Sequence, residues 1–248
     1  MLQAVLRLVV LTLSLIILTV FTVVGVRWMG SQQSFQPPHH PWFEREFWAI
    51  ADLPIEELCA AKDLDQSPGE KWIVEVPVKR KDESWFVPCA QPVPLKDFLT
   101  RTTHRDILLN VQAHDTWSLD ELLSAAGAFD KTKNFAVTAN SQKVSAYLRK
   151  KAPQWLFAAD STSLLRLRTF TSFYIESAID FWPDFVIADP RAKDLPQLDE
   201  RMAAELDRRH KRIILKWNES DSTTPSFPIH GIMTDRPSAA AKIWGKRL

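Results

Sequence analysis

The sequence predicts an α/β protein in which an eight-stranded parallel barrel follows one N-terminal transmembrane helix. Two observations lead to this prediction. A long uncharged run lies near the N-terminus, and the rest of the chain alternates short apolar runs with longer amphipathic ones, eight times in all. Because parallel strands need helical crossovers, eight strand–helix pairs favour a (β/α)8 barrel of the TIM type. An open, doubly wound sheet is the alternative.

The first expected domain, residues 1–28, is a transmembrane anchor. The run from Leu8 to Val26 carries no charge and spans about 28 Å as a helix, close to the thickness of the hydrocarbon core. Arg7 and Arg27 flank it, and Trp28 follows as an interfacial aromatic residue. A cleaved secretory signal is the alternative, but its apolar region is usually shorter. We expect a single-pass membrane protein with the main domain on the extracytoplasmic side.

Residues 29–45 are expected to be a flexible linker. The stretch is polar and rich in proline, and such a composition cannot bury a core. His39 and His40 are adjacent and do not share a helical face, so we take them as linker residues rather than metal ligands. The barrel is expected to occupy residues 46–248.

The eight strands are predicted at short runs rich in β-branched and aromatic residues, as expected for strands buried on both faces. They are Trp48–Asp52, Trp72–Val78, Ile107–Gln112, Phe135–Ala139, Leu156–Asp160, Phe185–Asp189, Arg212–Trp217 and Gly231–Asp235. Barrel chemistry lies at the carboxyl ends of the strands. The polar residues there are Asp52, Glu75, Asn110, Gln112, Thr138, Asn140, Asp160, Asp189, Asn218 and Asp235, a set that contains no histidine.

Composition narrows the possible functions. The chain has 248 residues, with 31 Lys and Arg against 30 Asp and Glu, so no basic excess suggests a nucleic-acid partner. Glycine-rich phosphate loops are disfavoured because only six glycines are present. Cys59 and Cys89 are too few for a disulfide framework or a closed zinc site. They either form one bridge in an oxidising compartment or are separate small core residues, and we favour the second.

Four segments carry motifs in a recognisable order. His230–Pro237 contains Gly-Ile-Met-Thr-Asp-Arg-Pro, and Pro94–Leu99 precedes the predicted strand Ile107–Gln112 at a characteristic distance. Phe135–Pro153 contains a strand, a Leu-Arg pair and an Ala-Pro pair. In order and spacing these segments resemble the glycerophosphodiester phosphodiesterase family over most of the predicted barrel.

The resemblance implies hydrolysis of a phosphodiester by two histidines, with a divalent cation held by carboxylates. This sequence differs from the family pattern at these catalytic and metal-binding positions. The family's first histidine would lie near Asp52, and its Glu-x-Asp pair is reduced to Glu75. Asn110 and Gln112 replace a Glu-x-Lys pair, and Trp85–Cys89 lacks the second histidine.

The remaining metal candidates are Glu75, Asn110 and Gln112. Calcium and magnesium prefer several anionic oxygens, whereas amides add no charge. Any site for Ca²⁺ or Mg²⁺ is therefore expected to be weak, and no cofactor is firmly predicted.

The catalytic candidates His114, Asp160 and Asp189 are weak. His114 and Asp115 form a His-Asp pair that would serve as a relocated acid, although Asp115 also suits the start of the following helix. Asp160 and Asp189 would form an acid–base pair across the barrel mouth, but strand-end aspartates commonly end strands and cap helices, which we favour.

Lys79 and Trp217 are the substrate-binding candidates. Lys79 is expected near the upper rim, where it would meet a phosphate or an anionic head group. Trp217 either forms an apolar wall of the mouth or packs in the core.

The favoured hypothesis is a membrane-anchored, non-catalytic barrel linked to phospholipid metabolism. It would bind a phosphodiester, a lipid head group or a protein partner. The alternative is an active phosphoric diester hydrolase with a rebuilt site that uses Glu75, His114, Asp160 or Asp189. The first is favoured because similarity of fold does not by itself carry activity.

Overall fold

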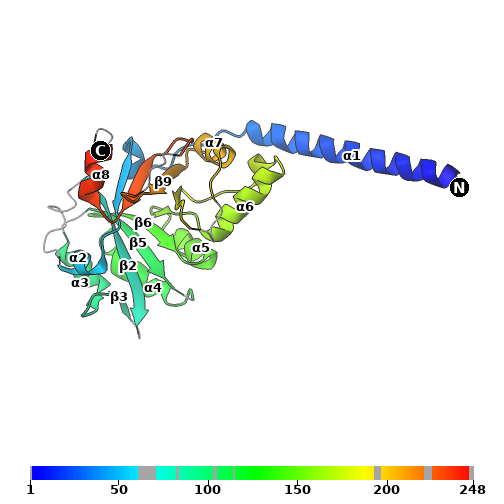
Figure 1. Cartoon of the computed structure of the whole chain (residues 1–248). Coiled ribbons are helices and arrows are strands. Elements are labelled where there is room, and N and C mark those ends of the chain that lie inside the picture. The colour runs from blue at the N-terminus through cyan, green and yellow to red at the C-terminus, as the bar shows by residue number, and fades with distance from the viewer. Residues whose placement is uncertain are drawn as a thin grey trace.

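Eight parallel strands form a barrel, helices surround it, and one long helix projects from it at the N-terminus (Figure 1). This computed structural model describes residues 2–60, 71–81, 84–102, 105–113, 115–192, 197–220 and 225–245. The predicted TIM-type fold is confirmed. The open-sheet alternative is excluded because the first and last strands of the sheet lie next to each other and are joined by a β-bridge.

The strand order is β7-β6-β5-β2-β1-β10-β9-β8. A parallel bridge between Ala158 and Phe185, and a 2.8 Å hydrogen bond from the Ala159 N–H to the Phe185 carbonyl, join its two ends into a nearly closed barrel. All eight predicted strands are present, as β1 (Trp48–Ala51), β2 (Ile73–Lys81), β5 (Asp106–Gln112), β6 (Asn134–Ala139), β7 (Leu156–Phe157), β8 (Phe185–Ala188), β9 (Arg212–Lys216) and β10 (Gly231–Thr234).

Helices cover the outside of the barrel. They are α2 (Ile55–Ala60), α3 (Leu95–Arg101), α4 (Leu119–Gly127), α5 (Gln142–Lys151), α6 (Ser161–Ser172), α7 (Glu200–Arg208) and α8 (Pro237–Trp244), with a short 3-10 helix η3 (Glu176–Ala178) after α6.

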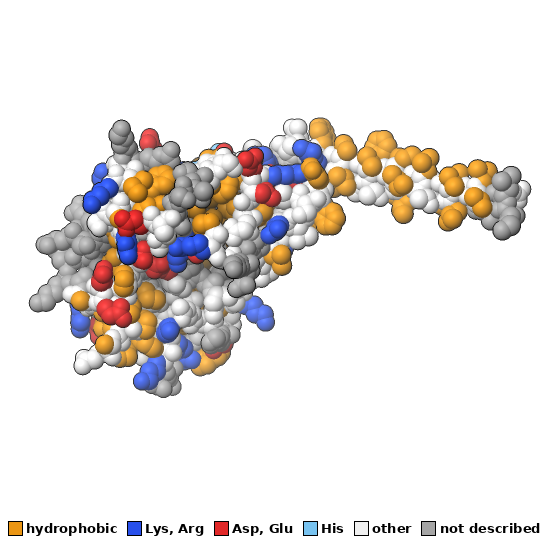
Figure 2. All heavy atoms as spheres, viewed as in Figure 1, with side chains coloured by type: hydrophobic (Ala, Val, Ile, Leu, Met, Phe, Trp, Pro, Cys, Tyr) orange, Lys and Arg blue, Asp and Glu red, His pale blue; other side chains and the backbone are white. Residues whose placement is uncertain are grey.

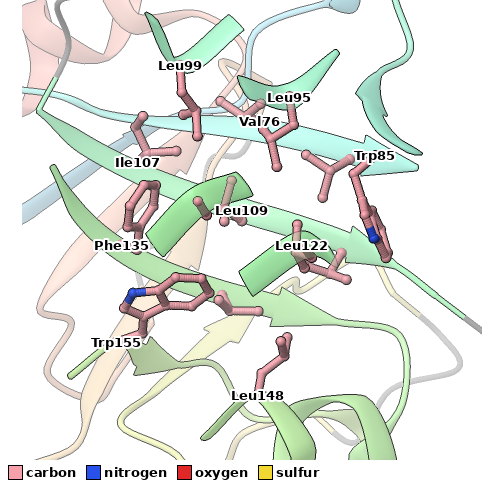
Figure 3. Packing of buried hydrophobic residues seen from close by; sticks show 14 of the residues in the cluster. Val76, Trp85, Leu95, Leu99, Ile107, Leu109, Leu122, Phe135, Leu148 and Trp155 are labelled. Atoms are coloured by element: carbon pink, nitrogen blue, oxygen red, sulfur yellow. The ribbon is translucent and has the colours of Figure 1, made fainter. Parts of the chain in front are cut away.

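Strand alternation divides the core into an outer and an inner layer. On β5, Ile107 and Leu109 pack against the helices in one buried cluster, which Figure 3 shows. Leu108 belongs to a different cluster, in the barrel interior. Asn110, two residues further on, therefore also points inward, at the carboxyl end of the barrel.

Strand β2 continues beyond the barrel rim and pairs there with β3 (Ser84–Val87), which pairs in turn with β4 (Val93–Pro94). This extension carries Cys89 to α2, where it forms a disulfide with Cys59 at a Cα–Cα distance of 5.8 Å. Our expectation that the two cysteines are separate core residues was wrong. The long-range approach of α2 to the end of β3 brings them together.

A short 3-10 helix, η1 (Pro41–Glu44), closes the amino-terminal end of the barrel. Its Trp42 is fully buried, and the indole N–H donates to the Asp106 carboxylate over 2.8 Å. Arg45 forms an ion pair with the same carboxylate. Although burial alone would raise the pKa of Asp106, hydrogen bonds and the charge of Arg45 lower it overall. The end of the predicted linker, from the buried His40 onward, is therefore part of the barrel.

The N-terminal helix α1 (Leu2–Ser31) is long and apolar enough to cross a membrane, with a mean hydropathy of 2.7 in its span Val5–Ser31. Three threonine hydroxyls within it donate to carbonyls one turn earlier, so these polar groups are satisfied inside the helix. Its last turn packs on η3. A Cβ on Gly30 would lie 2.3 Å from the Ser177 Cβ, so only glycine allows this approach.

Candidate functional site

A cavity of about 500 Å³ opens at the carboxyl ends of the strands. We call it the mouth cavity. Its walls carry polar side chains from six strands or the loops that follow them, and its apolar lining includes Leu164, Ile187 and Met233. The polar residues are Glu75, Asn110, Gln112, Thr138, Asn140, Ser161, Asp189 and Lys216. The predicted concentration of strand-end polar groups is thus present.

Glu75 is the most strongly perturbed group in the cavity. It is 6% exposed, and its carboxylate accepts a 2.7 Å hydrogen bond from the Asn110 amide. Burial, followed by the charge of Asp52 and a hydrogen bond with it, raises the pKa of Glu75 to about 8. Two carboxyl groups can share a hydrogen bond only if one of them is protonated. At neutral pH Glu75 therefore holds a proton, whereas the Asp52 carboxylate is paired with Lys216.

Lys216 provides the positive charge of the cavity. Its ammonium lies 3.1 Å from the Asp52 carboxylate. Burial alone would lower the pKa of Lys216, but Asp52, Glu75 and Asp189 raise it overall, so the side chain is cationic. Asp52 and Lys216 neutralise each other. Protonated Glu75, Asp52 and Lys216 form a hydrogen-bonded cluster with no net charge.

Polar groups beyond this cluster are available for contacts with a ligand. Gln112 and Asn140 present amides to the cavity, and Ser161 presents a hydroxyl. The Thr138 hydroxyl is buried and has no hydrogen-bond partner among the described residues. A buried hydroxyl without a partner is costly, and a ligand oxygen or hydroxyl would satisfy it.

The predicted site residues divide into two groups. Glu75, Asn110, Gln112 and Asp189 come together in the mouth cavity. Asp189 also accepts a hydrogen bond from the Arg191 backbone N–H over 2.9 Å.

The other candidates lie elsewhere. Asp160 is the N-cap of α6 and accepts from the Ser163 N–H over 2.8 Å, the structural role that we favoured. Lys79 is exposed on the β2 extension, and Trp217 packs in a buried cluster with Trp72 and Ala240. Neither lines the cavity, and His114 lies outside the described residues.

Among the polar residues that line the cavity, Ser161 and Lys216 were not predicted from the sequence. Only the last residues of each predicted strand were considered, and β9 was expected to end at Trp217. Alternation along β9 was the available signal, because Ile214 lies in the interior cluster and Lys216 follows two residues later.

The fold has counterparts among solved structures. A glycerophosphodiester phosphodiesterase from Parabacteroides distasonis is similar with a TM-score of 0.55 and 12% sequence identity, over 82% of this chain and 98% of that one. This chain has a glycerophosphodiester phosphodiesterase-like fold. The enzyme from Agrobacterium tumefaciens has a TM-score of 0.48 at 9% identity, over 80% of this chain and 99% of that one. No family model matches the sequence, and no curated protein does.

The phosphodiesterase resemblance implies a divalent cation, but the mouth cavity does not fit one. Among the described residues, no three His, Cys, Asp or Glu side chains converge as metal ligands would. Asn110 directs its amide N–H, and not its carbonyl oxygen, at the Glu75 carboxyl group. The Lys216 ammonium lies against Asp52, where it would repel a second cation. Ca²⁺ prefers six to eight oxygen ligands, and these groups offer few that are free.

Proposed function

We propose that this chain is a membrane-anchored, non-catalytic relative in fold of the glycerophosphodiester phosphodiesterases. It binds a small phosphodiester or a lipid head group in the mouth cavity and serves phospholipid metabolism as a binding protein. The observation that carries the proposal is the neutral cluster of Glu75, Asp52 and Lys216. Its groups are engaged with one another at the position where the resemblance implies metal ligands and a catalytic histidine.

The cluster lacks the features of a phosphodiester hydrolysis site. Proton transfer needs a group that is free to reach the reacting oxygen. Glu75 has the pKa for this role, but Asn110 and Asp52 engage its carboxyl group. Lys216 is paired with Asp52. Among the described residues that line the cavity, Lys216 is the one cation, and it is already partly neutralised by Asp52.

The same cavity suits the binding of a small polar molecule. Small-molecule sites typically have volumes of about 300–1,000 Å³, with apolar walls and a few convergent polar groups. Lys216 offers donors to a phosphate oxygen, and the Gln112 and Asn140 amides and the Thr138 hydroxyl offer partners to glycerol hydroxyls. We therefore expect binding without a metal ion.

The anchor and its orientation are part of the proposal. Helix α1 has the length and hydropathy of a membrane span, and the flanking charges favour a cytoplasmic N-terminus. The Cys59–Cys89 disulfide is consistent with an oxidising compartment for the barrel. A reporter enzyme that is active only outside the cytoplasm, fused after the last residue, should therefore be active.

One assay tests the catalytic part. The full chain in detergent is incubated with glycerophosphocholine or glycerophosphoethanolamine, in the presence of Ca²⁺, Mg²⁺ or EDTA, and release of glycerol 3-phosphate is followed. We expect no turnover under any condition. Calorimetric titration with the same diesters should show binding that EDTA does not change and that Lys216→Met weakens.

The rebuilt hydrolase is the second candidate, and the raised pKa of Glu75 is the observation in its favour. It would replace our proposal if turnover were measured that is lost in Glu75→Gln but retained in Glu57→Gln. The latter is a matched control, because Glu57 is exposed on α2.

A further inference from the structure

The length of α1 places its last turn in the head-group layer. If the uncharged run from Leu8 to Val26 fills the hydrocarbon core, Gly30 lies four residues further along the helix. At 1.5 Å per residue, this is about 6 Å beyond the hydrocarbon boundary. The head-group layer is itself about 5–8 Å thick on each side. Any part of the barrel that touches Gly30 must therefore lie at the membrane surface.

The barrel does touch Gly30 directly. Ser177 of η3 packs against it, and the Arg208 guanidinium donates to the carbonyls of Gly30 and Gln33 over 3.3 and 3.2 Å. The Arg208 guanidinium also lies 5.0 Å from the ring of Phe35. No free tether separates α1 from the domain at this point. The face around η3 is thus held against the bilayer.

Two large aromatic side chains are exposed on this face. Phe173 is 66% exposed and Tyr174 is 58% exposed, at the end of α6 that lies beside α1 in Figure 1. Figure 2 shows hydrophobic side chains along α1 and on the neighbouring edge of the domain. Exposed aromatic residues of this size are unfavourable in water. Tyrosine is, however, one of the residues that concentrate at membrane interfaces.

Tyr174 is held in a fixed position. Tyr174 has a φ of 61°, which non-glycine residues rarely adopt. The Arg201 guanidinium lies 3.7 Å from the Tyr174 ring centroid and forms a two-pronged ion pair with Glu176, the first residue of η3. Neighbouring contacts thus fix both the backbone and one face of the ring.

We propose that Phe173 and Tyr174 insert into the interface of the bilayer that α1 crosses and form a second membrane contact. The pair and α1 together fix the orientation of the barrel relative to the membrane plane. This inference rests on the proposed membrane anchor. It adds a fixed orientation, because an anchor helix without a second contact would leave the barrel able to rotate relative to the membrane.

Spin-label accessibility in phosphatidylcholine nanodiscs tests the proposal with the full chain. The described cysteines are both in the disulfide, so an introduced cysteine can be labelled selectively. Ser172→Cys reports on the proposed contact and leaves both rings in place. Ser238→Cys, an exposed serine on α8 far from α1, is the matched control. Leu15→Cys reports on the anchor itself.

We expect the label at position 172 to collide with a water-soluble nickel complex about threefold less often than the label at 238, because polar reagents are depleted at the interface. Replacing Phe173 and Tyr174 by serine in the same background should remove this protection.

Three outcomes would contradict the proposal. If the label at position 172 is accessible to the nickel complex while the label at position 15 is protected, the second contact is wrong and the anchor stands. If the label at position 15 is also accessible, both are wrong. Protection at 172 that survives the double replacement would refute the assignment to these two rings.

Discussion

Replacing Glu75 by glutamine should change how the stability of the protein depends on pH. In the folded protein the pKa of Glu75 is raised to about 8 by burial and by Asp52, whereas its ordinary value is 4.5. Between these two pH values the folded state holds a proton that the unfolded state has lost. The free energy of unfolding must therefore fall as pH rises through this window, and the contribution is complete below pH 4.5.

The size of the effect follows from the same pKa values. One pKa unit corresponds to about 1.4 kcal/mol, so the upper limit for the change is about 5 kcal/mol. Because Glu75 interacts strongly with Asp52, we expect a smaller change in the free energy of unfolding, about 2–4 kcal/mol. Glutamine keeps an oxygen that accepts from Asn110 and gains an amide N–H that can donate to Asp52. It thus mimics protonated Glu75 and does not titrate.

Urea unfolding of the full chain in detergent, followed by tryptophan fluorescence from pH 5 to pH 9, measures the effect. As pH rises across this range, the free energy of unfolding of wild type should fall by about 2–4 kcal/mol relative to that of Glu75→Gln. The exposed control Glu57→Gln should follow wild type. If the free energies of unfolding of wild type and Glu75→Gln differ by the same amount at every pH, the proposed sharing of a proton between Glu75 and Asp52 is refuted.

Three further changes test other parts of the structure. Lys216→Met should leave the Asp52 charge unpaired and cost about 1–3 kcal/mol in urea unfolding at pH 7, and an unchanged stability would contradict the neutral cluster. The Cys59–Cys89 disulfide joins residues that are 30 positions apart in the sequence. Its reduction should therefore lower the free energy of unfolding by about 3–4 kcal/mol, measured as a lower urea midpoint in the presence of reductant. Arg209→Met should cost about 3 kcal/mol, because it removes a buried partner of Glu205, whereas an effect below about 1 kcal/mol would show that Arg208 alone suffices.

The barrel was predictable from sequence because its strands are buried on both faces. Each strand is a short apolar run, and the repeated spacing of runs and helices needs no knowledge of long-range contacts. The polar ends of the strands followed from the same pattern, and Glu75, Asn110, Gln112 and Asp189, which were expected there, all line the mouth cavity.

The features that sequence reasoning missed depend on tertiary contacts. Trp42 lies in a proline-rich stretch that predicts a linker, and only its burial against Asp106 and Trp48 makes it part of the barrel. The approach of Cys89 to Cys59 requires the β2 extension. Lys216 cannot be distinguished from an ordinary surface lysine unless the inward face of β9 is known.

If α1 anchors the chain as proposed, the closing of the barrel by η1 limits how the domain could be released from the membrane. Proteolytic shedding that keeps the barrel intact would have to cut between the end of α1 at Ser31 and the buried His40. A cut at the predicted domain boundary, residue 46, would remove Trp42 and expose the Asp106 carboxylate and the Trp48 ring that it covers. A secreted form of this protein should therefore begin within Gln32–His39.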